Sequence, residues 1–246
     1  MDRMIYVAAS GVRATMQRQE VLANNLANVN TPGFRAETVA FRVAPVNGEG
    51  LQTRAFVAET TPGADFTPGV ITSTGRTLDI AIQGQGFFAV QGADGREGYT
   101  RNGGFTVNDQ GQLVTHAGQA VLGDGGPISV QPGTVLSIGS DGSISAAPAG
   151  GGNAVTPVAR LKLVNPPTAD LSRGTDGLFR MKDGSEPAAD VRVRVNSGSI
   201  ESSNVNAVET MVGMITLARQ FEMQMKLMQS ADAAARKGAQ LLGANA

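Results

Sequence analysis

The fold of this chain is decided by residues 211–242, which read MVGMITLARQFEMQMKLMQSADAAARKGAQLL. Apolar or neutral side chains recur there at alternating intervals of three and four residues, at Met211, Met214, Ala218, Phe221, Met225, Met228, Asp232, Ala235, Ala239 and Leu242. A spacing that averages 3.5 residues keeps one narrow seam on one side of an α-helix. A helix of about 32 residues extends ~48 Å, which is longer than a small β-domain can cover. We therefore expect this helix to pack against more than its own domain.

The beginning of the chain repeats the same spacing, at Ile5, Ala8, Val12, Thr15, Gln19, Leu22, Leu26 and Val29. This pattern predicts a helix over residues 3–29. Pro32 disfavours helical geometry at Thr31 and Gly33 permits a turn, so the helix should end before them. The second helix should begin near residues 204–208, with Ser202, Ser203 or Asn204 as its N-cap.

Two long seams at the two ends of one chain indicate a device that joins chains. The alternative is that each seam is buried in the core of its own protein, which is common for apolar helix stripes. Against this alternative, the sequence contains no third or fourth helix that could cover both seams.

Between the helices the sequence is typical of β-structure. Residues 34–74 contain Pro45, Pro62 and Pro68 and predict an extended connector with some strand character and no helix. Strands are predicted at Leu78–Gln83, Phe87–Val90, Phe105–Val107, Leu113–Thr115, Ile128–Val130, Val135–Ile138, Val158–Val164 and Val191–Val195. Asp-Gly pairs at 94–95, 124–125, 141–142, 176–177 and 183–184 favour tight hairpin turns. None of these pairs has the ligand spacing of a calcium loop, so no metal site is predicted.

Composition excludes several classes of function. The chain has 246 residues and a net charge of −1 without a basic face, which argues against nucleic acid as a partner. No apolar run is long enough to span a membrane. The sequence has no Trp and two Tyr, so it offers few stacking platforms for sugars or bases. It has no Cys, which excludes disulfides and thiolate chemistry.

The residues give little reason to expect catalysis or a cofactor. His116 is the single histidine and is predicted to be an ordinary surface residue. Gly84-Gln85-Gly86 lacks the third glycine and the following helix of a dinucleotide site. The opening segment contains Asp2 and Arg13 and makes a poor signal peptide, so any export should not use an ordinary cleaved signal. A β-domain carbohydrate-binding protein or enzyme with oligomerising helices is the remaining alternative.

Three blocks carry a family resemblance. The first is ANNLANVNTPGF at residues 23–34. The second is LDIAIQGQGFF at 78–88 followed by YTRNGGF at 99–105. The third is SNVNAVE at 203–209 running into ARQFEMQ at 218–224. Together they resemble the flagellar axial proteins, the family of rod, hook and hook-associated subunits. The matching motif residues in the first block are Asn24, Asn25, Leu26, Ala27, Asn28, Thr31, Pro32, Gly33 and Phe34.

Further stretches resemble the proximal rod subunits of that family. They are MDRMIY at residues 1–6, GDGGPI at 123–128 and GTDGLFR at 174–180. Another axial subunit of the family, from the distal rod or the hook, is the closest alternative.

The resemblance implies a structural subunit of the flagellar rod, the drive shaft that transmits torque from motor to hook, and not an enzyme. It implies an α+β fold in which long terminal helices pair in a coiled-coil-like tube. The expected helical assembly domain comprises residues 1–30 and 203–246, the extended connector 31–74 and 197–202, and the all-β domain 75–196. Implied partners are copies of the chain, other proximal and distal rod subunits and the flagellar type III export apparatus, with the rod in the periplasmic space. No cofactor is implied.

The assembly seam expected from spacing consists of Ile5, Val12, Leu22, Leu26, Val29, Met211, Met214, Ala218, Phe221, Met225 and Met228. Asn24, Asn25 and Asn28 are poor helix formers within a helical stretch. Their side chains either form hydrogen bonds between neighbouring subunits or mark a fraying helix end, and the sequence leaves both interpretations open.

Overall fold

The computed structural model describes residues 2–45, 55–59, 63–131, 133–148 and 155–243. They form two compact units. The helical unit consists of residues 1–27, 37–65 and 206–246, and the β unit consists of residues 28–36 and 66–205. The chain therefore passes from one unit to the other four times, after Ala27, Ala36, Asp65 and Val205.

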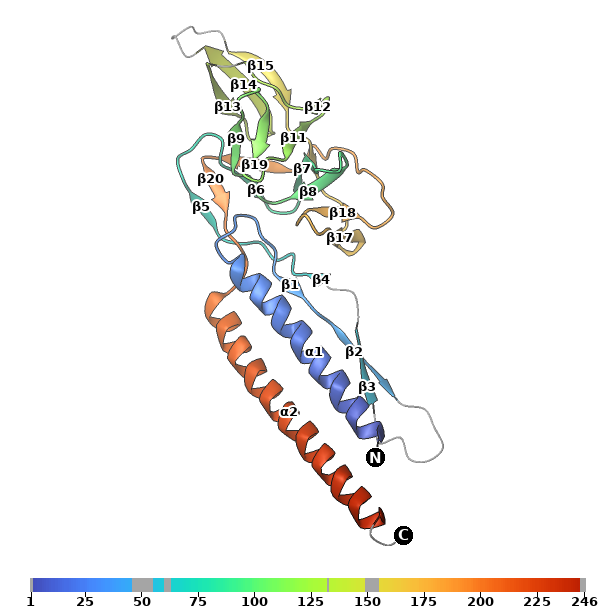
Figure 1. The fold of residues 1–246 in the computed structure, drawn as a ribbon. Coiled ribbons are helices and arrows are strands. Elements are labelled where there is room, and N and C mark those ends of the chain that lie inside the picture. The colour runs from blue at the N-terminus through green and yellow to red at the C-terminus, as the bar shows by residue number, and fades with distance from the viewer. Residues whose placement is uncertain (1, 46–54, 60–62, 132, 149–154, 244–246) are drawn as a thin grey trace. The chain divides into compact units, whose positions relative to one another are not determined.

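Two long helices dominate the helical unit, α1 (Asp2–Ala27) and α2 (Ala207–Gly243). They lie side by side and run in opposite directions (Figure 1). Gly213 of α2 lies against Leu22 of α1, and a Cβ atom added to Gly213 would be 3.0 Å from the Leu22 Cδ1 atom. Gly11 of α1 lies against Gln224 of α2, where an added Cβ would be 3.6 Å from Nε2. This register places the start of α1 beside Ala233, so the last turns of α2 extend beyond α1.

Four short strands complete the helical unit. β2 (Phe41–Pro45) and β3 (Ala55–Glu59) form an antiparallel pair, and β3 packs along α1. β1 (Glu37–Thr38) pairs with β4 (Gly63–Ala64). The sequence predicted an extended connector with some strand character here, but not the bounds of these strands, because the segment gave no clear alternation of apolar and polar residues.

The helix ends lie close to prediction: α1 ends at Ala27, two residues before the predicted 29, and α2 begins within the predicted 204–208, but its cap differs. Asn206 caps α2, since its Oδ1 atom accepts hydrogen bonds from the N–H groups of Val208 and Glu209 at 3.1 and 3.2 Å. The predicted caps, Ser202, Ser203 and Asn204, were wrong because this segment is still part of the β unit. The turn after α1 is confirmed, with Gly33 at φ +66°.

The largest sheet of the β unit has nine strands. Seven of them lie in the order β17-β18-β8-β7-β11-β10-β9, while β12 pairs with β11 and β16 pairs with β7. Their bounds are β7 (Phe87–Gln91), β8 (Glu97–Thr100), β9 (Phe105–Val107), β10 (Leu113–Thr115), β11 (Ala120–Gly123), β12 (Gly126–Pro127), β16 (Leu163–Val164), β17 (Leu171–Arg173) and β18 (Phe179–Met181).

Smaller pairings surround this sheet (Figure 1). β13 (Thr134–Ile138), β14 (Ser143–Pro148) and β15 (Thr156–Arg160) form a three-stranded antiparallel sheet. β6 (Ile80–Gln83) pairs with β19 (Arg194–Ser197), and β5 (Ile71–Ser73) pairs with β20 (Ser199–Glu201). A single 3-10 turn, Thr168–Asp170, precedes β17.

A continuous apolar core fills the β unit. Phe88, Phe105, Ile80, Leu113 and Val121 are each fully buried within it. All but Val121 come from strands that the alternating pattern predicted, and β9 and β10 have the predicted bounds; β11, which holds Val121, was not predicted. The strand predicted at Ile128–Val130 was wrong. Only Ser129 forms a bridge there, to Gln112, while Ile128 and Val130 are buried as loop residues.

The Asp-Gly turns are largely confirmed. Gly95, Gly142 and Gly177 have φ values of +78°, +82° and +79° and connect β7 to β8, β13 to β14 and β17 to β18. In the β11–β12 hairpin the positive φ, +110°, belongs to Gly126 and not to Gly125. Gly184 also has a positive φ but does not connect paired strands. The helices together with this β unit make the fold α+β, as predicted.

Candidate interaction surface and connector cluster

Helix α2 is apolar on two opposite faces. The inner face contains Gly213 and Gln224, which contact α1, together with the buried Leu217 and the half-buried Phe221 and Met228. The opposite face, which we call the outer stripe, consists of Val208, Met211, Val212, Ile215, Met223 and Leu227. These six side chains are between 50% and 71% exposed. At 100° per residue the two faces point in opposite directions.

The single chain does not bury the whole expected seam. Met214, Phe221, Met225 and Met228 are half-buried, whereas Met211 and Ala218 are exposed, and Thr210 and Leu217 occupy the neighbouring buried positions. On α1 the half-buried members are Val12, Leu22 and Leu26, with Val29 just after the helix. The Ile5 side chain lies outside the described residues. Contact of this seam with neighbouring molecules stays a prediction.

A groove of about 630 Å³ opens on the helical unit. Its apolar lining includes Leu22 from α1 and Val212 and Leu217 from α2. Glu37, Glu209 and Arg18 contribute charged groups to the same groove. Arg18 also lies over the Phe41 ring, with its guanidinium carbon 4.7 Å from the ring centroid. An open groove of this kind can receive an apolar side chain that is accompanied by charge.

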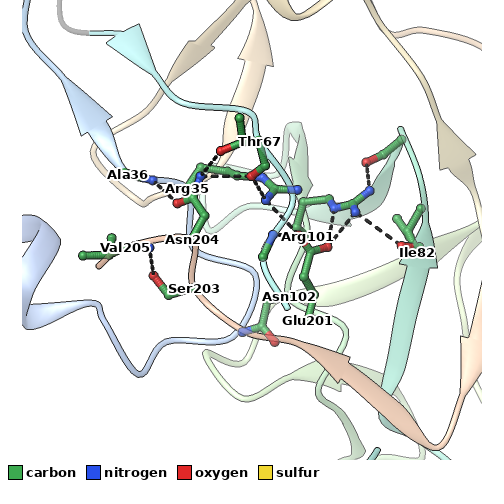
Figure 2. A network of polar contacts seen from close by, with 12 residues as sticks. Arg35, Ala36, Thr67, Ile82, Arg101, Asn102, Glu201, Ser203, Asn204 and Val205 are labelled. Atoms are coloured by element: carbon green, nitrogen blue, oxygen red, sulfur yellow. Dashed lines mark hydrogen bonds and ion pairs between the residues drawn. The ribbon is translucent and has the colours of Figure 1, made fainter. Parts of the chain in front are cut away.

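A second notable feature, which we call the connector cluster, lies entirely within the β unit and consists of Arg35, Arg101 and Glu201 (Figure 2). The three side chains are 3%, 2% and 0% exposed. Glu201 Oε1 accepts from Arg35 at 2.8 Å, and Oε2 accepts from Nε and an Nη of Arg101 at 2.7 and 2.6 Å. Arg101 also donates to the backbone oxygens of Gly86 and Ile82 at 2.8 and 3.3 Å.

The connector cluster, together with Asn204, holds together the β-unit ends of three of the four chain passages, those after Ala36, Asp65 and Val205. Glu201 accepts a hydrogen bond from Gly69 N–H at 2.9 Å, and Arg35 donates to the Thr67 carbonyl at 2.6 Å. Asn204 donates to the same carbonyl at 3.0 Å and accepts from the Ala36 N–H group at 2.7 Å (Figure 2). Segments that leave and enter the helical unit are thus bound to one another inside the β unit.

The charge of this cluster is unbalanced, because two guanidinium groups share one carboxylate. The pKa of Arg101 is lowered overall. Burial is the largest cause of the lower pKa and the nearby Arg35 adds to it, while Glu201 partly offsets them. Arg35 Nε is buried and has no hydrogen-bond acceptor among the described residues. Removing the single carboxylate would therefore leave two buried positive charges without their counter-ion.

Sequence reasoning missed this cluster. Arg101 lies inside the quoted YTRNGGF block and Arg35 directly follows the first block, but charged residues are usually exposed. Arg101 and Glu201 are 100 residues apart in the sequence, and no local pattern connects them. The one sequence feature that could have pointed to the cluster is that Arg35 and Arg101 lie beside or inside the blocks that carry the family resemblance.

The motif residues act within the chain. Asn25 is 5% exposed, donates to the Glu37 carbonyl at 2.9 Å and accepts from the Glu37 N–H group at 2.7 Å. Asn28 Oδ1 accepts from the Thr31 hydroxyl at 3.1 Å. Asn25 is therefore ordered and used within the chain, which fits neither a fraying helix end nor a hydrogen bond to a neighbouring subunit. Asn24 differs, because its side chain is exposed.

Gly33 and Phe34 have packing roles in the same motif. A Cβ atom at Gly33 would lie 2.3 Å from backbone atoms of Arg101 and Asn102. The guanidinium of Arg173 stacks over the Phe34 ring, with its carbon 4.4 Å from the ring centroid. Leu26, Thr31 and Pro32 are half-buried and Ala27 is exposed.

Little in the described residues suggests chemistry. His116 is exposed, and its Nδ1 atom lies 2.8 Å from the Gly104 carbonyl oxygen, which fits the predicted surface role. Across the described ranges, no three His, Asp or Glu side chains are grouped as metal ligands. In that same part of the chain no helix combines the length and apolarity of a membrane span.

Comparison with known proteins gives consistent matches. The family described as "Flagella basal body rod protein" matches residues 5–35, "Flagellar hook protein FlgE/F/G D1 domain" matches 81–146, and "Flagellar basal body rod FlgEFG protein C-terminal" matches 196–241. The chain is 49% identical to the flagellar basal-body rod protein FlgF of Escherichia coli K12, covering 98% of this chain and 99% of that protein.

Two further relatives are less similar to this chain. FlgF of Caulobacter vibrioides is 35% identical, over 99% of both chains. A flagellar basal-body rod protein named FlgG, from Buchnera aphidicola of Schizaphis graminum, is 30% identical over 96% of this chain and 98% of its own. Similarity thus extends over the helices and the β unit alike.

Proposed function

The chain belongs to the FlgF group of flagellar basal-body rod proteins, a structural family and not an enzymatic one, and we propose that its terminal helices build it into the rod. The proposed assembly domain comprises residues 1–30 and 203–246. In this proposal the helices of neighbouring subunits form a coiled-coil-like tube. The parts of the expected seam, from Ile5 to Met228, that the single chain leaves uncovered lie between subunits together with the outer stripe.

The observation that carries this proposal is the double apolar character of α2. A helix that is apolar on both faces is normally buried on both faces. In the single chain only the inner face has a partner, and the outer stripe is exposed from Val208 to Leu227. Its methionines, Met211 and Met223, have flexible side chains that adapt to differently shaped neighbours.

Assembly of this kind would also restrict rod formation to the growing end of the rod. Exposed helices gain little stability in water by themselves and more when neighbours cover them. A head-to-tail contact that does not close into a ring produces a helical tube. The subunit would therefore remain incomplete until it reaches the growing end of the rod.

The position and route of the subunit are part of the proposal. We place it in the proximal rod, within the periplasmic space, in contact with copies of itself and with other proximal and distal rod subunits. Higher identity to FlgF relatives than to an FlgG relative supports the proximal position. Passage through the flagellar type III export apparatus without a cleaved signal completes the route, and the assembled shaft would transmit torque from motor to hook.

The test is Ile215→Asp, a change in the centre of the outer stripe. We expect this variant to be exported but to give no rods and no motility, because a charge would be buried against the neighbour. Gln110→Asp introduces the same residue at an exposed polar position of the β unit, away from the outer stripe, and should assemble normally. The thermal melting of the β unit should be equal in both variants. Normal rods with Ile215→Asp would refute assembly through this face.

A further inference from the structure

The groove on the helical unit has an acidic excess. Glu37 and Glu209 line it together with one basic residue, Arg18, which already stacks on Phe41. Glu209 is exposed and lies in the first turn of α2. Between these charges the groove presents apolar surface from Leu22, Val212 and Leu217. A suitable occupant therefore combines apolar side chains with positive charge.

The same helix carries such a segment further along. Met223 and Leu227 are 60% and 66% exposed, and Arg219 and Lys226 are exposed on the same side of α2. None of these four residues lines the groove. The amino-terminal half of α2 thus contributes an acidic groove. Its carboxyl-terminal half carries a ridge of Arg219, Met223, Lys226 and Leu227, which we call the basic ridge; with the exposed Glu222 between its two cations, it has one net positive charge.

We propose that the basic ridge of one copy of the chain docks into the acidic groove of the next copy. The inference rests on the proposed rod assembly and adds to it a named pair of surfaces and a second copy as the partner. Met223 and Leu227 would cover Val212 and Leu217, while Arg219 and Lys226 would face Glu37 and Glu209.

The placement of the two surfaces gives the contact a direction. Ridge and groove lie at different levels of one helix, about ten residues or ~15 Å apart along its axis. A contact between different surfaces is heterologous, so each docked copy leaves a free ridge at one end and a free groove at the other. Such a contact adds subunits in sequence and does not stop at a dimer.

The test is a charge-reversal cycle with Glu209→Lys and Lys226→Glu in cells that make only the altered chain. Each single change should lower the number of basal bodies per cell about tenfold, because it places like charges opposite each other. The double variant should restore at least half of the loss. Asp109→Lys, at an exposed position of the β unit, is the matched control and should have no effect.

An acidic residue in the first turn also favours the helix itself, so Glu209→Gln serves as a second variant. It should cause a smaller loss than Glu209→Lys, and adding Lys226→Glu to it should bring no recovery. Recovery in the Glu209→Lys pair alone identifies the charge contact and not helix stability.

The remaining outcomes overturn the inference. Two impaired single variants without recovery in the double would mean that ridge and groove face other rod subunits and not a second copy. Unimpaired single variants would exclude this docking, yet the proposed function would stand if Ile215→Asp still prevented rods. If Ile215→Asp also assembled normally, the proposed function itself would fail.

Discussion

The two units of this chain differ in how completely they bury their apolar side chains. The β unit has a core in which Phe88, Phe105 and Leu113 lose all contact with solvent. Among the described residues of the helical unit, Leu217 is the one apolar side chain that reaches comparable burial, at 8% exposure. The contrast is not one of composition, because α2 is rich in methionine and leucine.

This difference shows that apolar content and finished packing are separate properties. The β unit satisfies its hydrophobic residues within one chain, and its connector cluster even buries three charges. The helical unit presents a comparable kind of surface on Val208, Ile215 and Leu227 and leaves it exposed. We interpret the first unit as complete in the monomer and the second as complete only in an assembly, and four predictions test this interpretation.

The largest expected effect is in amide hydrogen exchange of the purified monomer. Core strands of the β unit should exchange on the order of ten-thousandfold more slowly than α2, because they open only with the whole unit. Exchange measured by mass spectrometry on peptides from residues 80–122 and 207–243 would show it. Equal protection in α2 would mean that α1 alone is enough to stabilise the helix, and the contrast between units would fail.

The second effect concerns the connector cluster. Glu201→Ala should destabilise the β unit by about 3–5 kcal/mol, since it leaves Arg35 and Arg101 buried without a counter-ion. Chemical denaturation followed by near-ultraviolet circular dichroism, which senses the buried Tyr99, would measure the loss. Arg192→Ala removes an ion pair whose arginine is 84% exposed and should shift the midpoint much less than Glu201→Ala. A small effect of Glu201→Ala would show that solvent reaches the cluster.

The third effect compares two glycines with the same left-handed backbone. Gly33→Ala should cost about 2–4 kcal/mol, because its Cβ would overlap the Arg101–Asn102 peptide in addition to the strain of a positive φ. Gly95→Ala, at φ +78° with no atom within 4 Å of its added Cβ, should cost only about 1–2 kcal/mol. Thermal unfolding of both variants gives the difference. Equal costs would mean that the contact at Gly33 relaxes freely.

The smallest effect is a pH dependence at the surface of the β unit. Hydrogen bonds from the Arg192 side chain and backbone lower the pKa of Asp190 from 3.8 to about 2. Because the folded pKa lies below the unfolded one, this contribution is fully present above pH 4 and is lost as the pH falls through 2. Asp190→Asn should therefore flatten the acid limb of the stability curve slightly. An unaltered acid limb would show that the pair is fully screened by solvent.

Sequence reasoning succeeded where a structure depends on neighbours along the chain. The spacing of Leu22, Leu26 and Phe221 predicted the helices, and alternation predicted β9 and β10 with their observed bounds. It failed at Ile128–Val130, where burial comes from tertiary contacts without a strand ladder. It also placed the cap of α2 too early, because Asn204 is used by the β unit and leaves Asn206 for the helix.

The functional features divide in the same way. The exposed apolar stripe of α2 lies in the helix that spacing had singled out, although the single chain buries Leu217 where spacing favoured Ala218. The connector cluster could not be derived, since Glu201 lies near the end of the β unit and meets Arg35 and Arg101 only once the rest of that unit has folded. Long-range ion pairs leave no periodic trace in a sequence.

The meeting of Phe34 and Asn204 has a consequence for how such proteins diversify. The N–H group of Asn204 donates to the Phe34 carbonyl at 3.3 Å, so two residues far apart in sequence stand one hydrogen bond apart in space. A segment whose two ends meet can lengthen, shorten or be exchanged while the residues outside it keep their places. Evolution can therefore alter the segment between these two residues as an insertion, and the helices at the two termini keep a common pattern.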